Sequence, residues 1–220
     1  MNSNSLKADR IRIYGDTSEK ICIILIDDSA DKEEPVDVVC DGYFVVSYPV
    51  DDWNTDLSPW EAPPVFGNKP FGNGAASLLA FIEGELLPYI DKNFGPKKYI
   101  PAGYSLAGLF SLYCICNSGS FAGAIAVSPS VWFPGWIKYA SGCDIHAEYV
   151  YLSLGDKESK TKNAVMSSVE DNIRTMHDIL LEKGIDSCLE WNKGGHFNEP
   201  DARMQKGIDA AVQHYGKKGF

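Results

Sequence analysis

Residues 99–108 read Tyr-Ile-Pro-Ala-Gly-Tyr-Ser-Leu-Ala-Gly, and small and apolar residues continue from there to position 116. The first four residues are typical of a buried strand, and the run at 109–116 is typical of a small-residue helix. Glycine at position 103 and alanine at position 107 leave room for the two elements to approach closely. The segment therefore predicts a strand and a helix joined by a sharp turn that carries Ser105.

Working outward from this turn, short β-rich runs alternate with longer amphipathic stretches. This alternation predicts an α/β fold with a mostly parallel sheet and helices on both faces. No stretch resembles an interdomain linker, so residues 1–220 are expected to form a single domain. The expected strands are 11–14, 21–26, 43–48, 99–102, 122–127, 148–154 and 187–191, and the expected helices are 75–93, 109–116, 164–183 and 201–215.

Composition narrows the classes of function. Apolar residues make up 45% of the 220 residues and the formal net charge is −10. Such a charge disfavours nucleic acid and anionic membranes, which are bound chiefly through Lys and Arg. The first ten residues lack the apolar stretch of a signal peptide, so a cytoplasmic protein without a membrane partner is expected.

The six cysteines are scattered along the chain, and several lie in apolar runs. This distribution predicts reduced, buried thiols. Zinc ligands would need closer clustering than the cysteines and the four histidines provide, so no metal site is expected. Nothing else in the sequence indicates a cofactor.

Ser105 is the candidate nucleophile. A hydroxyl held on a strand-to-helix turn stands clear of the sheet edge, where an imidazole can take its proton. The amide of Leu106, at the helix start, would donate to a developing oxyanion. A second amide would come from Asp28 or Ser29 after the strand at 21–26, provided that the nearby carboxylates turn outward.

His196 is the candidate base. It follows Gly194 and Gly195 in a loop after the last expected strand, from which its ring can reach over the sheet edge. The other histidines, at positions 146, 177 and 214, lie in polar or helical surroundings and are expected at the surface.

The third member of a serine triad would be a carboxylate at a strand end between Ser105 and His196. Asp156 and Glu158 both follow the strand that ends at residue 154, and spacing alone does not separate them. The longer side chain of Glu158 suits a turn that has already left the sheet, which favours Glu158 and keeps Asp156 as the alternative.

The ordered motifs resemble those of the α/β-hydrolases, in the esterase branch that includes enterochelin-esterase-like, esterase-D-like and feruloyl-esterase-like enzymes. The resemblance implies an α/β-hydrolase fold without a large lid domain, with Ser105, Glu158 and His196 as the triad. Ala107 departs from the usual glycine, and no His-Gly pair follows the strand at 21–26. The matching pieces are 103–113, 128–132, 155–158 and 194–197, and the resemblance implies that 128–132 lines the acyl or alcohol side of the pocket.

The loop at 49–74 holds five prolines and is too aromatic for a plain connector, so its part 51–73 is the expected cover of the site. Tyr104, Trp53, Trp60 and Trp132 are the expected substrate-contacting residues, with Trp136 a further aromatic at the same sheet edge.

The expected function is a serine carboxylesterase acting on a small or aryl-acyl ester, with a siderophore ester or a thioester as open substrate classes. An acyltransferase on the same fold and a catalytically silent binding module are the alternatives. The expected partner is a small-molecule ester, and self-association into a homodimer is left open.

Overall fold

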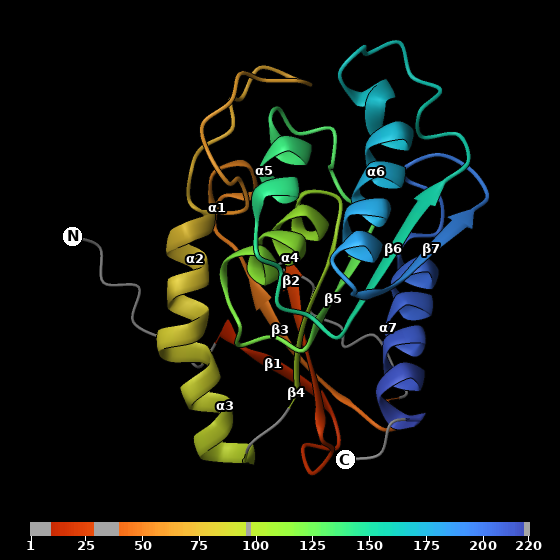
Figure 1. Ribbon diagram of the computed structural model, residues 1–220. Coiled ribbons are helices and arrows are strands. Elements are labelled where there is room, and N and C mark those ends of the chain that lie inside the picture. The colour runs from red at the N-terminus through yellow and green to blue at the C-terminus, as the bar shows by residue number, and fades with distance from the viewer. Residues whose placement is uncertain (1–9, 29–39, 96–97, 218–220) are drawn as a thin grey trace.

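The computed structural model describes residues 10–28, 40–95 and 98–217. Seven strands form one sheet in the order β1-β3-β2-β4-β5-β6-β7, and only β1 runs antiparallel to its neighbour (Figure 1). The mostly parallel α/β sheet expected from the sequence is confirmed. The strands are β1 (Arg12–Gly15), β2 (Ile21–Asp27), β3 (Phe44–Pro49), β4 (Lys98–Tyr104), β5 (Gly123–Val127), β6 (Tyr149–Gly155) and β7 (Asp186–Asn192).

Helices cover both faces of this sheet, because the central strands are apolar on both sides. One core lies under α2 (Ala75–Phe81), α3 (Leu87–Phe94), α4 (Leu106–Asn117) and α6 (Val169–Glu182). A second core lies on the opposite face, where α7 (Pro200–Lys217) packs through Ile208, Ala211 and Tyr215. Figure 1 shows α7 apart from the other helices, behind the strands.

The helix expected at 75–93 is interrupted. Between α2 and α3 the backbone widens into a π-helical stretch, η2 (Ile82–Leu86). Pro88 has no N–H to give to the carbonyl of Gly84, and the loss of that bond favours such a widening. Residues 164–183 are also less regular than expected, since the 3₁₀ turn η3 (Met166–Ser168) precedes α6.

The loop after β3 is structured, as its aromatic content suggested. It contains the short helix α1 (Trp53–Asp56) and an isolated bridge between Ala62 and Phe71. The Trp60 indole N–H donates to the carbonyl of Pro134 at 2.9 Å, which fastens the loop to the segment before α5 (Trp136–Gly142). Neither α1 nor α5 was expected from the sequence.

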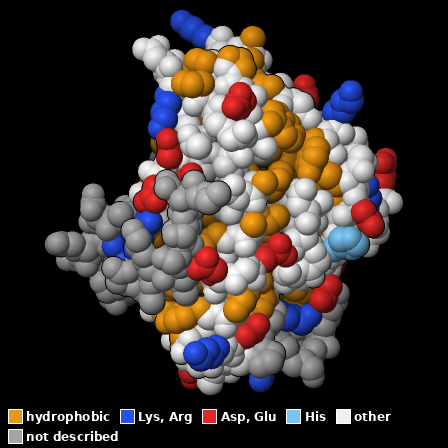
Figure 2. Space-filling model, turned by 90° about the vertical axis from the view of Figure 1, so that its left-hand side faces the viewer, with side chains coloured by type: hydrophobic (Ala, Val, Ile, Leu, Met, Phe, Trp, Pro, Cys, Tyr) orange, Lys and Arg blue, Asp and Glu red, His pale blue; other side chains and the backbone are white. Residues whose placement is uncertain are grey.

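Acidic side chains are spread among hydrophobic ones over the face shown in Figure 2, in keeping with the net charge of −10. None of the helices within 10–28, 40–95 and 98–217 is both long and apolar enough to span a bilayer. Across the same residues, no group of three or more His, Cys, Asp or Glu side chains is arranged to hold a metal ion.

The six cysteines are free thiols, and three of them are buried as expected: Cys22, Cys114 and Cys116. The other three are partly exposed, which corrects the prediction of uniformly buried thiols. His214 also differs from expectation, because its side chain is only 10% exposed and its ring stacks on Tyr149.

Candidate active site

Ser105 lies at the junction of β4 and α4. Its backbone dihedral angles, φ 58° and ψ −118°, are ones that residues other than glycine rarely adopt. Such strain persists only where neighbouring structure enforces it. Here the amide of Ser105 donates to Val127 and its carbonyl accepts from Ser130, both at 3.0 Å. The turn is therefore fixed by the last residue of β5 and by the segment that follows it.

Two small residues let α4 start this close to β4. A Cβ added at Gly103 would lie 2.4 Å from the backbone of Ala107, so no larger residue fits there without a shift. A Cβ at Gly108 would lie 3.0 Å from the Gly103 carbonyl and 3.2 Å from Pro129. Ala107 itself is fully buried, and its methyl group is accommodated because Gly103 faces it.

His196 reaches the hydroxyl of Ser105 from the loop between β7 and α7. Its Nε2 lies 3.0 Å from Ser105 Oγ, and its Nδ1 lies 2.7 Å from Oε2 of Glu158. The loop is shaped by Gly194, whose φ of +99° favours glycine. A Cβ there would also meet Asn198 Oδ1, which accepts the amide of Gly195 at 2.7 Å.

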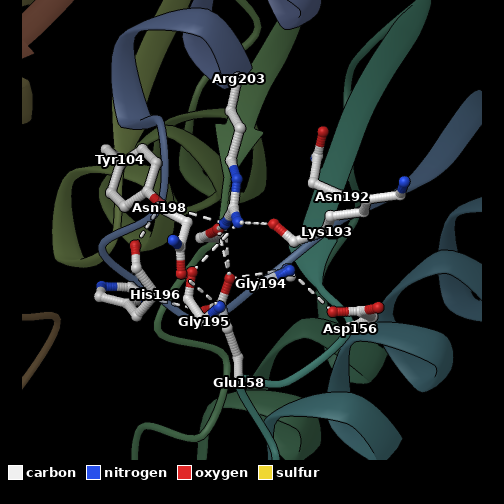
Figure 3. A network of polar contacts seen from close by, with 12 residues as sticks. Tyr104, Asp156, Glu158, Asn192, Lys193, Gly194, Gly195, His196, Asn198 and Arg203 are labelled. Atoms are coloured by element: carbon white, nitrogen blue, oxygen red, sulfur yellow. Dashed lines mark hydrogen bonds and ion pairs between the residues drawn. The ribbon is translucent and has the colours of Figure 1, made fainter.

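The Glu158 side chain is 4% exposed. Its Oε1, the carboxylate oxygen that does not face His196, accepts three hydrogen bonds. Oε1 accepts the amide of Gly155 at 2.7 Å, the hydroxyl of Ser128 at 2.8 Å and Nη1 of Arg203 at 3.1 Å (Figure 3). These donors hold the carboxylate so that its other oxygen points at His196. A neutral His196 would then carry its proton on Nδ1 and present Nε2 as the acceptor.

Asp156, the alternative acid, is placed differently. Its carboxylate accepts the amide of Gly194 at 2.8 Å, on the side of the network away from the His196 ring (Figure 3). The arrangement makes Asp156 a support of the histidine loop, while Glu158 meets the imidazole.

Burial is the largest influence on the pKa of the Glu158 carboxyl and by itself would raise it. The hydrogen bond and charge of His196, with the Gly155 amide and the Ser128 hydroxyl, outweigh that influence and hold the pKa below its ordinary value of 4.5.

This depressed pKa predicts a pH-dependent share of stability. The ionised carboxylate stabilises the fold fully above pH 4.5, and that contribution is lost as the pH falls through the lower pKa of the folded state. Urea unfolding of the natural protein and of Glu158→Gln should therefore give a difference in unfolding free energy that shrinks below pH 4.5. A difference in unfolding free energy that stays constant with pH would contradict a lowered pKa of Glu158 in the folded state.

The candidate oxyanion donors named from the sequence differ in whether their amide is available to a substrate oxygen. Leu106 is the first residue of α4, and the first amides of a helix have no acceptor within it. Asp28 follows β2, which is next to β4 in the sheet, but its amide donates to Oδ1 of Asp27 at 2.7 Å. Ser29 lies outside the described residues.

Of the expected substrate contacts, Trp132 lies in the segment after β5 whose Ser130 amide donates to the carbonyl of Ser105. It is two residues after Ser130, whose Oγ lies 3.4 Å from Ser105 Oγ. Its ring meets Phe66 and Phe71, each with ring centres 6.0 Å apart. Phe71 also lines a surface hollow of about 500 Å³ with residues 61–63, 70 and 72, beside this aromatic cluster.

The remaining aromatic candidates have other contacts. Trp60 packs edge-on against Phe133 and Tyr139, and Trp53 is half-buried against the core at the start of α1. Trp136 is fully buried and fills the interior. The Tyr104 hydroxyl donates to the backbone carbonyl of His196. Substrate contact by Trp53, Trp60 and Tyr104 stays a prediction.

Three polar residues of the site were given no individual role from the sequence: Ser128, Ser130 and Arg203. The two serines lie in the segment 128–132, which the family resemblance placed along the acyl or alcohol side of the pocket. Arg203 gives no such signal, since an arginine in the first turn of a polar helix resembles a solvated surface charge.

The fold and the strand-turn-helix placement of Ser105 define the class of protein as an α/β-hydrolase. A family model described as "Putative esterase" matches residues 25–199, so the chain belongs to that family, which is one of carboxylic ester hydrolases. A curated relative from Bacillus subtilis (strain 168), "Uncharacterized protein YbbA", is 26% identical over an alignment of 150 positions that covers 63% of this chain. That alignment spans 60% of the relative's length.

Solved structures share the fold at low sequence identity. The siderophore hydrolase EstA from Aspergillus nidulans is 19% identical, with a TM-score of 0.68 over 92% of this chain and 89% of that one. An IroE-like serine hydrolase from Shewanella oneidensis is 17% identical, with a TM-score of 0.72 over 89% and 71%. The enterobactin esterase FES from Shigella flexneri is 16% identical, with a TM-score of 0.65 over 96% and 56%.

Proposed function

We propose that this protein is a serine carboxylesterase that cleaves a small or aryl-acyl ester through an acyl-enzyme intermediate. The observation that carries the proposal is the pair of hydrogen bonds through His196, at 3.0 Å to Ser105 Oγ and 2.7 Å to Glu158. Both distances suit proton transfer from the hydroxyl through an oriented imidazole.

In the first half-reaction, Ser105 Oγ forms a bond to the ester carbonyl carbon while its proton passes to His196 Nε2. The carbonyl oxygen becomes negative and accepts the amide of Leu106. The carbon–alkoxide bond then breaks, and Nε2 returns the proton to the leaving alcohol. The ionised Glu158 stabilises the imidazolium that exists between these two transfers.

In the second half-reaction, water takes the place of the alcohol. It gives a proton to Nε2 as its oxygen bonds to the acyl carbon. The bond from that carbon to Ser105 Oγ then breaks, the acid leaves, and Nε2 returns the proton to Oγ. Deacylation by an added alcohol would yield a new ester instead. Product analysis in the presence of a short alcohol therefore separates a hydrolase, which releases the acid, from an acyltransferase, which releases chiefly the new ester.

An aryl-acyl substrate is favoured by the aromatic cluster of Phe66, Phe71 and Trp132, since Trp132 follows Ser130 by two residues and Ser130 Oγ lies 3.4 Å from Ser105 Oγ. Aromatic rings provide large apolar contacts and edge-to-face partners for a bound ring. Among the proteins that share this fold is the enterobactin esterase FES, solved in the presence of 2,3-di-hydroxy-N-benzoyl-glycine and 2,3-di-hydroxy-N-benzoyl-serine, which carry benzoyl groups.

Substitution of Trp132 by alanine should lower kcat/KM for an aryl-acyl ester by at least about tenfold more than for an acetyl ester of the same alcohol. The measurement is the ratio of the two kcat/KM values. Trp191→Ala is the matched control, because the indole of Trp191, on β7, packs against the guanidinium of Arg174 and not in the cluster. An unchanged ratio in Trp132→Ala would remove the support for an aryl acyl group.

A further inference from the structure

Arg203 is a buried charge that the reaction described above does not use. It lies in the first turn of α7 and is 2% exposed. A guanidinium is costly to bury unless its donors are satisfied, so its partners indicate why the position holds an arginine.

The partners of Arg203 fall into two groups (Figure 3). Nη1 donates to Oε1 of Glu158 at 3.1 Å, and to the hydroxyls of Tyr104 and Ser128 at 3.3 Å each. Nη2 donates to the carbonyls of Lys193 at 2.9 Å and Gly195 at 3.1 Å. One nitrogen thus holds the acid, and the other holds the loop that carries His196.

We propose that Arg203 is a positioning residue of the esterase site, whose planar fork fixes the acid and the histidine loop relative to each other. This inference rests on the proposed function. A side chain that only neutralised Glu158 would need a single contact with the carboxylate. The hydrogen bonds from Nη2 to the carbonyls of Lys193 and Gly195 do something else: they hold the backbone that precedes His196.

The same geometry explains why lysine would not replace arginine here. A lysine ammonium is a single point of charge, whereas guanidinium presents its donors in a rigid plane. Lysine at position 203 could stay near Glu158 and keep the buried charge paired. It could not hold the carbonyls of Lys193 and Gly195 in the same directions at the same time.

The test compares Arg203→Lys with Arg174→Lys, a matched change at an exposed arginine that pairs with Glu170 on α6. Arg203→Lys should lower kcat for ester hydrolysis, and the rate of labelling by a fluorophosphonate, by about 10- to 100-fold, with KM changed less than about threefold. Arg174→Lys should match the natural protein. Equal labelling rates in folded Arg203→Lys and natural protein would overturn the inference, as would a loss confined to KM.

A second readout needs no turnover. Hydrogen exchange at the amides of Gly194 and Gly195 should be faster in Arg203→Lys, while exchange within α4 is unchanged. If the fluorophosphonate did not label the natural protein, the proposed function would fail. Hydrogen exchange would still decide whether Arg203 orders the loop, because unchanged exchange in Arg203→Lys would overturn that claim. Should Arg203→Lys not fold, Arg203→Gln removes the charge and is measured in the same way.

Discussion

Replacing Ser105 by alanine is expected to lower ester turnover by at least about 10⁴-fold while the thermal unfolding temperature stays close to that of the natural protein. The hydroxyl is the group that becomes covalently bonded to the acyl carbon, and no other atom of the side chain takes its place. The backbone of the turn is held by bonds to Val127 and Ser130 that do not involve the hydroxyl, so the fold should persist. Steady-state kinetics on one ester and a thermal melt check both parts.

Ser130→Ala is the matched control, since its Oγ lies only 3.4 Å from that of Ser105. It should remain within about tenfold of the natural turnover, because His196 Nε2 lies at 3.0 Å from the hydroxyl of Ser105 and takes its proton from that group. If Ser130→Ala lost activity and Ser105→Ala kept it, the nucleophile would have been assigned to the wrong serine.

Glu158→Gln is expected to reduce kcat by about 10⁴-fold, the effect that the corresponding acid-to-amide change has in serine proteases. An amide has one acceptor oxygen, whereas both oxygens of Glu158 accept hydrogen bonds here. If the NH₂ group faces His196 Nδ1, the imidazole is driven to the wrong tautomer. If it faces the other way, three donors lose their acceptor.

Asp156→Asn tests the alternative acid and should cost less than about tenfold. An asparagine carbonyl can still accept the amide of Gly194, which is the bond that Asp156 makes to the histidine loop. Both variants are compared at saturating ester and one pH. A larger loss in Asp156→Asn than in Glu158→Gln would move the acid to Asp156.

The sequence was sufficient to place all seven strands along the chain, because each one is a short β-rich run bounded by turn residues. The turn at Ser105 was also predictable, since the small residues at 103 and 107 are needed for the close approach that a Cβ at Gly103 would block. The order of Ser105, Glu158 and His196 along the chain did not by itself imply that their side chains lie within hydrogen-bond distance, as they do in the fold. Their roles stay proposals.

What the sequence did not disclose are features that depend on distant contacts. The π-helical stretch at Ile82–Leu86 is a separate, local case, because the lost N–H of Pro88 favours it but hydrophobic periodicity does not register that loss. Arg203 looked like a surface charge because its partners come from β4 and from the loops after β5, β6 and β7. A single domain and a cytoplasmic location remain predictions from composition and sequence pattern.

The most direct test of the central claim is intact-mass analysis after incubation with a fluorophosphonate, applied to the natural protein, Ser105→Ala and His196→Ala. An activated serine predicts one adduct on the natural protein and none on either variant, because labelling needs both the hydroxyl and the imidazole that takes its proton. Absence of an adduct on well-folded natural protein, or an adduct that survives in Ser105→Ala, would contradict the account.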